Sequence, residues 1–207
     1  IINNGVDVEK FSFNNKAREA FRVKLALTET DILIGHVGYF MPVKNQSFLV
    51  DVLAELARND SRFHLILIGD GAMRTEIEQK VACLGLTNKV TFTGNVDNVS
   101  EYLNAIDIVI MPSLYEGLPL TLVEQQANGL QCVCSDTIAE EADKTGNLKF
   151  LSLNLGSVKW ASEINSFIQL DRRELRSKNA VKNIEEGGYS IYKEAQNLTA
   201  YYKNCIY

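Results

Sequence analysis

Short apolar runs alternate with longer amphipathic segments along most of the 207-residue chain. The short runs are rich in aliphatic and β-branched residues and have the length of strands. The longer segments carry apolar residues three and four positions apart, the spacing of one helix face. The predicted strands are 31–38, 62–69, 89–94, 107–113 and 130–136, and the predicted helices between them are 44–59, 72–86, 99–106 and 118–129.

This alternation predicts the fold class. Nearly continuous apolar strands separated by helices indicate a parallel sheet covered on both faces, because each parallel connection must cross over the sheet. From about residue 157 the pattern is helical throughout. We therefore predict an α/β fold, a Rossmann-like three-layer α/β/α domain with a mostly parallel sheet and extra C-terminal helices, spanning 1–207. Ligands of such sheets bind beyond the carboxyl ends of the strands, which here are Gly38, Gly69, Gly94 and Ser113.

Composition narrows the function classes. The formal net charge is −5, so no general basic surface is available for nucleic acid. No apolar run reaches the roughly 18 residues of a membrane span, and the start shows no signal peptide. We expect a cytoplasmic protein. Because the chain opens on Ile1 without an initiator methionine, we also expect it to be cut from something longer.

The cysteines do not predict a metal centre. Cys132 and Cys134 are two positions apart in a predicted strand, so both point to one face, and we expect them to be reduced core residues. A zinc site would need more nearby ligands than His36 and His64 provide. The sequence predicts no metal site and no cofactor.

The turn "LILIGDGAMR" at first looks like a dinucleotide fingerprint, since Gly69 and Gly71 follow a strand and open a helix. Arg74 stands in place of the third glycine, and no acidic residue ends the following strand to hold a ribose hydroxyl. A tight strand-to-helix turn at the rim of the ligand site is the better interpretation.

The segment "PSLYEGLPLTLVEQQANG", residues 112 to 129, predicts an anion site. Pro119 fits the first helical position, where its missing N–H costs nothing, so the helix is expected over 118–128. The amides of Leu118, Leu120 and Thr121 would then lack intrahelical partners and face an anion such as a diphosphate. Gly117, which has no side chain, lets a ligand approach the backbone.

Two carboxylates flank this anion site, and Lys44 stands at the expected start of another helix. Glu116 precedes the 118–128 helix and Glu124 lies inside it. Carboxylates beside an anion site make sense if each accepts hydrogen bonds from hydroxyls, as on a sugar and a ribose. Lys44 in a first helical turn opposes the helix dipole, which hints at an anionic ligand. The combination predicts a nucleotide-sugar site; alternatively, Glu116 is a capping acid, Glu124 a solvated helix residue and Lys44 a solvated charge.

Several spaced segments match a known family. The stretch 1–170 resembles the C-terminal, donor-binding domain of retaining GT-B glycosyltransferases of family 4, the "glycosyl transferases group 1" domain. The family's E-x7-E motif stands here as Glu116 to Glu124, and "INNGVD", "HVGYFMPVKN", "LILIGDGAMR" and "VTFTGNVDNVSEYLNAIDIVIMPS" follow the family's order. The segment "LYEGLPLTLVEQQANGLQCVCSD" is similar to bacterial enzymes of capsule or exopolysaccharide assembly.

The resemblance implies roles for particular residues. Glu116 would contact the donor sugar, Glu124 the ribose hydroxyls, and Lys44 the diphosphate, with Glu116 and Lys44 as the catalytic pair. The implied donor-binding residues are Gly38, Tyr39, Gly94, Asn95, Val96, Gly117, Leu118, Leu120, Thr121 and Glu124, of which 94–96 would border the nucleobase. The substrate would be a nucleoside-diphosphate sugar, with a UDP-sugar expected first, and no metal would be needed.

One position departs from the family pattern. The family usually has arginine directly after the glycine of the first loop, whereas this chain has Tyr39, whose hydroxyl carries no positive charge. Arg74 could replace the missing cation.

The resemblance also implies an N-terminal acceptor domain beyond this chain, reached by the last helix. The tyrosines Tyr189, Tyr192, Tyr201 and Tyr202 of that segment would be exposed here. The full protein would transfer a hexosyl unit to a sugar or lipid-linked acceptor and would associate peripherally with the membrane. Two alternatives stay open: a non-catalytic nucleotide-sugar binding or scaffold subunit, and a GT-B sugar-nucleotide epimerase.

Overall fold

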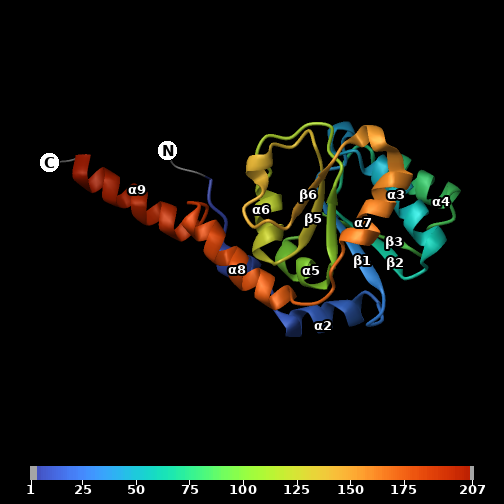
Figure 1. Ribbon diagram of the computed structural model, residues 1–207, viewed down its shortest axis with the longest axis horizontal. Coiled ribbons are helices and arrows are strands. Elements are labelled where there is room, and N and C mark those ends of the chain that lie inside the picture. Colours follow the sequence, from blue (N-terminus) through green and yellow to red (C-terminus); the bar gives the residue numbers. More distant parts are fainter. Residues whose placement is uncertain (1–3, 206–207) are drawn as a thin grey trace.

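The computed structural model describes residues 4–205, which form one parallel sheet with helices on both faces (Figure 1). The strands are β1 (Ile32–Val37), β2 (Phe63–Ile68), β3 (Val90–Gly94), β4 (Ile108–Met111), β5 (Gln131–Ser135) and β6 (Leu148–Leu151). Their order is β3-β2-β1-β4-β5-β6, and each pair of neighbouring strands is parallel. This confirms the α/β fold class predicted from the apolar pattern.

Helices connect the strands and extend beyond the last one. They are α1 (Val8–Phe11), α2 (Asn15–Lys24), α3 (Gln46–Asn59), α4 (Arg74–Cys83), α5 (Val99–Ala105), α6 (Leu120–Ala127), α7 (Gly156–Phe167), α8 (Arg173–Glu186) and α9 (Ile191–Cys205). Three short 3-10 turns are η1 (Pro42–Lys44), η2 (Glu140–Ala142) and η3 (Leu153–Leu155).

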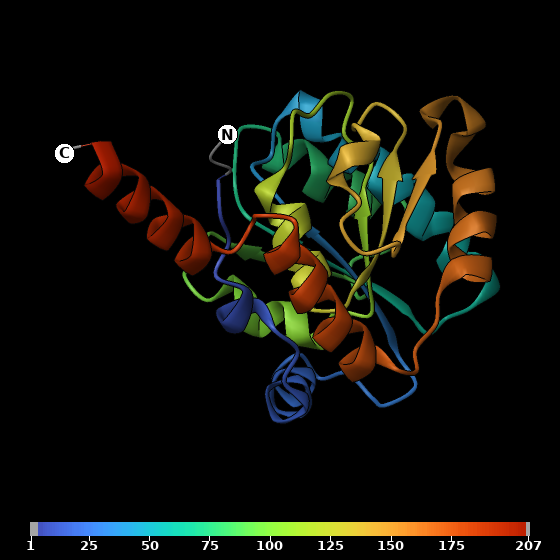
Figure 2. The ribbon, with the colours of Figure 1, turned by 60° about the vertical axis from the view of Figure 1, so that its left-hand side comes forward.

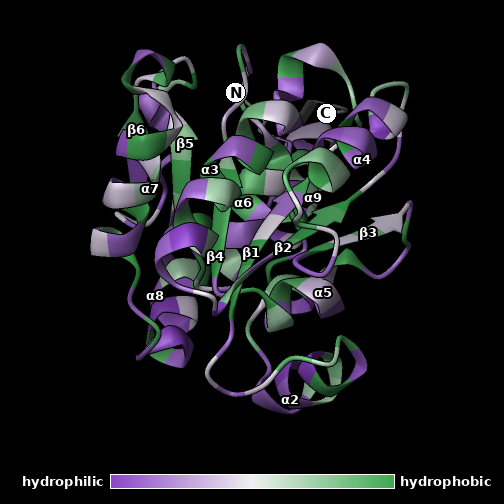
Figure 3. Cartoon of the chain, turned by 90° about the vertical axis from the view of Figure 1, so that its right-hand side faces the viewer, coloured by the Kyte–Doolittle hydropathy of each residue, from purple (hydrophilic) through white to green (hydrophobic). Residues whose placement is uncertain are grey.

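The alternation of side chains along each strand divides the core into two layers. In β1, Ile32 and Ile34 pack with α3, α4 and α7, whereas Leu33 between them packs with α1, α5, α6 and α8. Figure 3 shows hydrophobic residues gathered on the central strands and hydrophilic residues on the outward helix surfaces. Cys132 and Cys134 are buried and free on one face, as the strand spacing predicts.

One strand and two helices, β6, α1 and α2, are absent from the sequence prediction, and α1 has only four residues. β6 is a four-residue strand containing a lysine, too short to show an apolar run. α2 is highly charged, and the side it turns inward carries Arg18 and Arg22 beside a single aromatic residue, Phe21. Both guanidiniums bind the buried carboxylate of Asp107, at 2.5 and 2.9 Å. A pattern of apolar spacing cannot detect a helix that is anchored by ion pairs.

α9 projects away from the sheet domain (Figures 1 and 2). Its start is tied to the N-terminal segment, since Ile191 N–H donates to the carbonyl of Val6 over 3.0 Å. Tyr192, Tyr201 and Tyr202 are exposed on it, as expected. The expectation for Tyr189 was wrong: this ring precedes α9, packs against the core and lies under the ammonium of Lys144.

Candidate functional site

The strand order reverses direction between β1 and β4, and the carboxyl ends of these two neighbours define the candidate site. Connections from adjacent strands that leave toward opposite sides open a crevice at such a switch point. The loop after β1 carries Gly38 to Lys44, and the loop after β4 carries Pro112 to Pro119. The tertiary structure thus joins the two segments that the sequence singled out separately.

Lys44 and Glu116 form an ion pair across this switch point. The Lys44 ammonium lies 2.6 Å from Oε1 of Glu116, and their side chains are 19% and 14% exposed. The Ser113 hydroxyl donates to the same carboxylate oxygen over 2.9 Å. A mostly buried cation and carboxylate therefore share one position, where the cation could bind phosphate and the carboxylate could accept hydrogen bonds from hydroxyls.

The two loops are also joined through their backbones. Leu114 N–H donates to the carbonyl of Val43 over 2.8 Å, and the Asn45 side-chain amide donates to the carbonyl of Pro112 over 3.1 Å. Asn45 has a left-handed conformation, with φ of 54°, between η1 and α3. Lys44 therefore ends a 3-10 turn, and the expectation that it sits in the first turn of the helix was wrong.

The start of α6 supplies unpaired backbone donors. Pro119 is the N-cap, with φ of −74° and ψ of 108°, and the helix begins at Leu120 without a side-chain cap. The amides of Leu120 and Thr121 have no hydrogen-bond partner among residues 4–205. Leu118 lies two residues before the helix, so the predicted start was too early and Pro119 is not the first helical residue. Of the three amides predicted to face an anion, those of Leu120 and Thr121 lie in the first turn of α6.

Gly117 borders this predicted anion site. A Cβ built on it would meet no atom within 4 Å, so the backbone here is open on one side. Gly117 and Leu118 are both exposed. No described residue occupies the space beside Gly117 that a ligand would need to approach its backbone.

Glu124 lies one helical turn further along α6 and is half-buried. No hydrogen bond or ion pair holds its carboxylate within the described part of the chain. Burial raises its pKa to about 6, and Lys10 of α1 acts in the opposite direction. A carboxylate with free acceptor positions in a partly desolvated environment is suited to receive hydroxyl donors.

Glycines line the sheet edge beside the pair. Gly38 N–H donates to the carbonyl of Ile68, and Gly69 N–H donates to the carbonyl of Gly94, both over 3.0 Å. Gly69 and Gly94 have φ of 130° and 68°. Asn95, which follows Gly94, is exposed, and Val96 packs against the core. The structure therefore brings 94–96 to the same edge as Gly38.

Tyr39 and Arg74 do not supply a free cation next to Lys44. Tyr39 is 58% exposed. Arg74 pairs with Asp70 at 3.1 Å and with Glu78 at 2.7 Å, and its guanidinium lies over the Phe92 ring. It borders the Gly94 loop, 3.6 Å from where a Cβ of that glycine would be. The expectation that Arg74 could replace the missing arginine has no support in this arrangement.

His36 is a site residue that the sequence treated only as an insufficient zinc ligand. It is fully buried near the end of β1, and its Nδ1 lies 3.0 Å from the carbonyl oxygen of Ile110. Burial lowers its pKa to about 4, with Lys44 acting in the same direction. One sequence signal could have identified it: His36 alternates with Ile32 and Ile34 on the same face of β1, which predicts that its ring is buried.

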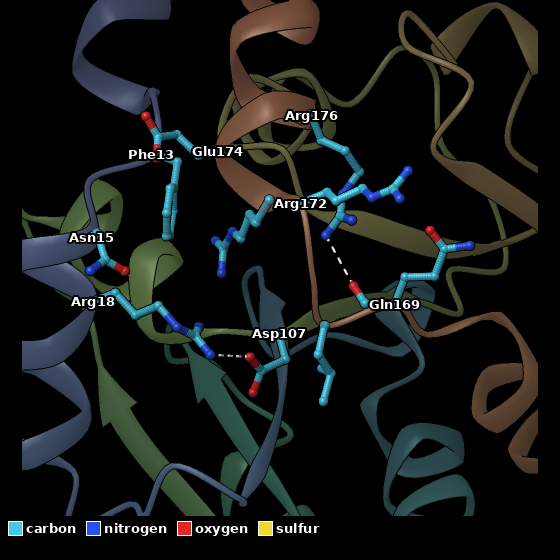
Figure 4. A pocket seen from close by; sticks show the side chains of 10 residues that line it. Phe13, Asn15, Arg18, Asp107, Gln169, Arg172, Glu174 and Arg176 are labelled. Atoms are coloured by element: carbon cyan, nitrogen blue, oxygen red, sulfur yellow. Dashed lines mark hydrogen bonds and ion pairs between the residues drawn. The ribbon is translucent and has the colours of Figure 1, made fainter.

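A pocket of about 360 Å³ lies at the amino end of β4, away from this edge. Figure 4 shows its lining, which includes Arg18, Asp107 and Arg176. Arg18 is paired with Asp107, and Arg176 donates to the carbonyls of Gly129, Asp171 and Gln169. These guanidiniums are engaged in holding α2 and α8 in place, so we assign this pocket to the packing of the helices.

Comparisons with known proteins bear on the family and the fold of the chain. The family described as "Glycosyl transferases group 1" matches residues 17–180. The chain is 39% identical over 165 residues to EpsF of Bacillus subtilis (strain 168), which is named as a glycosyltransferase. That match covers 79% of this chain and 43% of the relative. Over its whole length it is 26% identical to a UDP-Gal:alpha-D-GlcNAc-diphosphoundecaprenol alpha-1,3-galactosyltransferase of Escherichia coli, covering 54% of that protein.

Solved structures share the fold. Anabaena Alr3699/HepE in complex with UDP-glucose superposes with a TM-score of 0.80 at 23% identity, over 98% of this chain and 57% of that one. The chain thus spans about half the length of the relatives it matches. No described helix is long and apolar enough to cross a bilayer.

Proposed function

Since the chain belongs to the glycosyl transferases of group 1, we propose that it is the donor-binding half of a retaining hexosyltransferase. The donor is a nucleoside-diphosphate sugar, and the acceptor is a sugar or a lipid-linked sugar in capsule or exopolysaccharide synthesis. One observation carries the proposal: the Lys44–Glu116 pair lies at the switch point of the sheet, beside a helix start with unpaired amides.

The diphosphate would lie between Lys44 and the start of α6. The amides of Leu120 and Thr121 have no protein partner among the described residues, and the positive end of the helix dipole adds to them. When the bond from the anomeric carbon to the diphosphate breaks, negative charge grows on the leaving oxygen. Donors already in place stabilise that charge without reorganising. We propose that this electrostatic stabilisation is the main contribution of this half to catalysis.

The two glutamates would orient the hydroxyl groups of the donor. Glu116 would contact the sugar once the ligand has taken over Lys44, and Glu124 would accept from the ribose. Gly94, Asn95 and Val96 would border the nucleobase, while Gly38, Tyr39 and Gly117 would complete the walls. A uridine donor is supported by the UDP-glucose bound in the Anabaena structure and by the UDP-galactose in the name of the E. coli relative.

The acceptor would bind to a further domain outside this chain, so the isolated half is expected to be inactive. The E. coli relative is named for a diphosphoundecaprenol acceptor. A lipid-linked acceptor would place the full protein at the cytoplasmic face of a membrane. We expect no metal cofactor, because Lys44 and the α6 amides would take the part of a divalent cation.

Calorimetric titration of this 207-residue chain with UDP, ADP and GDP, without added metal, tests the donor site. We expect saturable binding of UDP that Glu124→Ala abolishes, with Glu101→Ala, an exposed helical glutamate, as the matched control. If none of the three nucleotides binds, this chain by itself does not contain a complete donor site. In the full-length protein Glu116→Ala should abolish transfer; full activity would reject the catalytic assignment.

A second candidate is a non-catalytic nucleotide-sugar binding subunit. The observation that favours it is the missing cation, since Tyr39 is uncharged and Arg74 is held by two carboxylates. This candidate predicts ligand binding without transfer even in the full-length protein. Product analysis with a UDP-sugar and a lipid-linked acceptor separates the two.

A further inference from the structure

His36 has a buried acceptor atom that no described residue uses. The side chain is fully buried, and its Nε2 has no hydrogen-bond partner in the described structure. Its Nδ1 faces the carbonyl of Ile110 at 3.0 Å. A carbonyl oxygen only accepts, so Nδ1 must carry the hydrogen, and Nε2 of the neutral ring presents a bare lone pair. The burial that lowers its pKa to about 4 keeps the ring in this neutral form.

The lone pair of Nε2 faces the space beside Gly38. A Cβ built on that glycine would lie 3.3 Å from His36 Nε2, and 3.5 and 3.6 Å from Cδ and Cε of Lys44. The imidazole and the lysine stem therefore converge on the point that the absent side chain leaves open. An unpartnered buried acceptor is unfavourable, and Lys44, whose stem borders the same open space, is the cation on which the proposed site depends.

The Lys44 ammonium has more donors than the resting protein uses. It carries three N–H groups, and among residues 4–205 Glu116 alone accepts a hydrogen bond from it. A carboxylate both directs the ammonium and cancels its charge. A neutral imidazole directs it and leaves the charge intact. This difference matters here because Tyr39 supplies no second positive charge to the loop.

We propose that His36 is a positioning residue for Lys44: its Nε2 accepts a hydrogen bond from the ammonium when that ammonium is released from Glu116. Release occurs when a diphosphate competes for Lys44 and Glu116 turns to the sugar. His36 then holds the cation in the cleft with its full charge toward the ligand. The role of the diphosphate rests on the proposed function, whereas the contact between His36 and Lys44 does not.

Nitrogen NMR of His36 tests the contact without any ligand. Glu116→Gln removes the charge that holds Lys44, so the ammonium should move to His36. We expect the Nε2 resonance to shift upfield toward the hydrogen-bonded value in Glu116→Gln, and to stay at the free value in Glu116→Gln/Lys44→Met. The same Nε2 shift in both proteins would overturn the inference, whatever the chain binds.

Two variants of His36 test its effect on ligand binding. Glutamine places a polar atom near the position of Nε2, whereas asparagine places one near Nδ1 and keeps only the bond to Ile110. We expect UDP affinity to fall roughly tenfold in His36→Asn and to stay near the wild-type value in His36→Gln. Thermal melting of both variants identifies a loss caused by misfolding, and uridine, which lacks phosphate, should bind all three proteins equally.

The outcomes separate this inference from the proposed function. Failure of the wild-type chain to bind UDP would count against the proposed donor site, and the NMR comparison would still decide the role of His36. Wild-type binding with equal UDP affinity in folded His36→Asn and His36→Gln would overturn the positioning role while leaving the donor site in place.

Discussion

The ammonium of Lys44 lies 2.6 Å from Oε1 of Glu116, although the two residues are 72 positions apart in the chain. In the absence of a ligand, the two side chains occupy each other's binding groups. Each member of the pair is proposed to bind a different part of the donor, so a ligand has to separate them. Their mutual attraction therefore opposes donor binding. Removing the carboxylate of Glu116 should raise the affinity for a diphosphate, whereas removing the ammonium of Lys44 should lower it.

Glu116→Gln should bind UDP more tightly than the wild type. UDP lacks the hexosyl group that Glu116 is proposed to contact, and the substitution frees Lys44 for the diphosphate, so we expect a gain of about threefold to tenfold. Lys44→Met removes the cation and should weaken UDP binding by roughly tenfold or more. Isothermal titration checks both; weaker binding in Glu116→Gln would contradict the competition between carboxylate and phosphate.

Tyr39→Arg should strengthen UDP binding by adding a cation to the first loop. Because Tyr39 is 58% exposed, solvent screens the new charge, and we expect a gain of about threefold to tenfold that shrinks as salt rises. Val23→Arg adds the same charge at a 77% exposed position of α2 and is the matched control. An equal gain in the control would show a general effect of net charge instead.

The raised pKa of Glu124 should make UDP binding depend on pH. The carboxyl group titrates at about 6 in the folded chain, and the ionised form is the stronger acceptor for ribose hydroxyls. Affinity should rise between about pH 5 and pH 7. UDP also titrates in this range, so Glu124→Gln is the control that isolates the contribution of the protein. Identical pH profiles for the two proteins would exclude Glu124 as the titrating group.

The same shift predicts how stability depends on pH without a ligand. The folded pKa of Glu124 lies above its ordinary value of 4.5, so between these values the folded state binds more protons than the unfolded one. The stabilisation by the neutral carboxyl is present below about pH 4.5 and is lost as pH rises through about 6. We expect this to cost about 1 kcal/mol after allowance for partial exposure. Urea unfolding of the wild type and Glu124→Gln measures it.

Alanine at two glycines of the site edge should have different effects, on the free energy of unfolding at Gly69 and on UDP affinity at Gly117. Gly69 has φ of 130°, and a Cβ there would lie 2.3 Å from the carbonyl oxygen of Gly38. Gly69→Ala should therefore destabilise the chain by about 2 kcal/mol or more. Gly117→Ala meets no atom within 4 Å and should change stability by less than about 0.5 kcal/mol, yet weaken UDP binding. Urea unfolding and titration separate the two effects.

The sequence by itself predicted the strands β1 to β5 and a helix start with free amides at one edge of the sheet. The run 62–69 contains four consecutive aliphatic residues, 65–68, so side chains on both faces of the strand are apolar. Only a strand buried on both faces explains this pattern. The residues of 112–129 predicted a helix start with free amides between two carboxylates, and the structure keeps Leu120 and Thr121 in that position. These features are local, because periodicity and helix termini depend on residues a few positions apart.

The tertiary structure alone decided which distant residues meet. Only the order β2-β1-β4 brings Lys44 to Glu116 and His36 to Ile110, since the neighbours of a strand depend on how connections cross the sheet. The inward face of α2 could not be predicted from the sequence for the same reason. Arginines such as Arg18 and Arg22 are normally solvent-exposed, and only the fold brings the carboxylate of Asp107 to them. Local pattern specifies elements, whereas charge pairing across the fold completes the site.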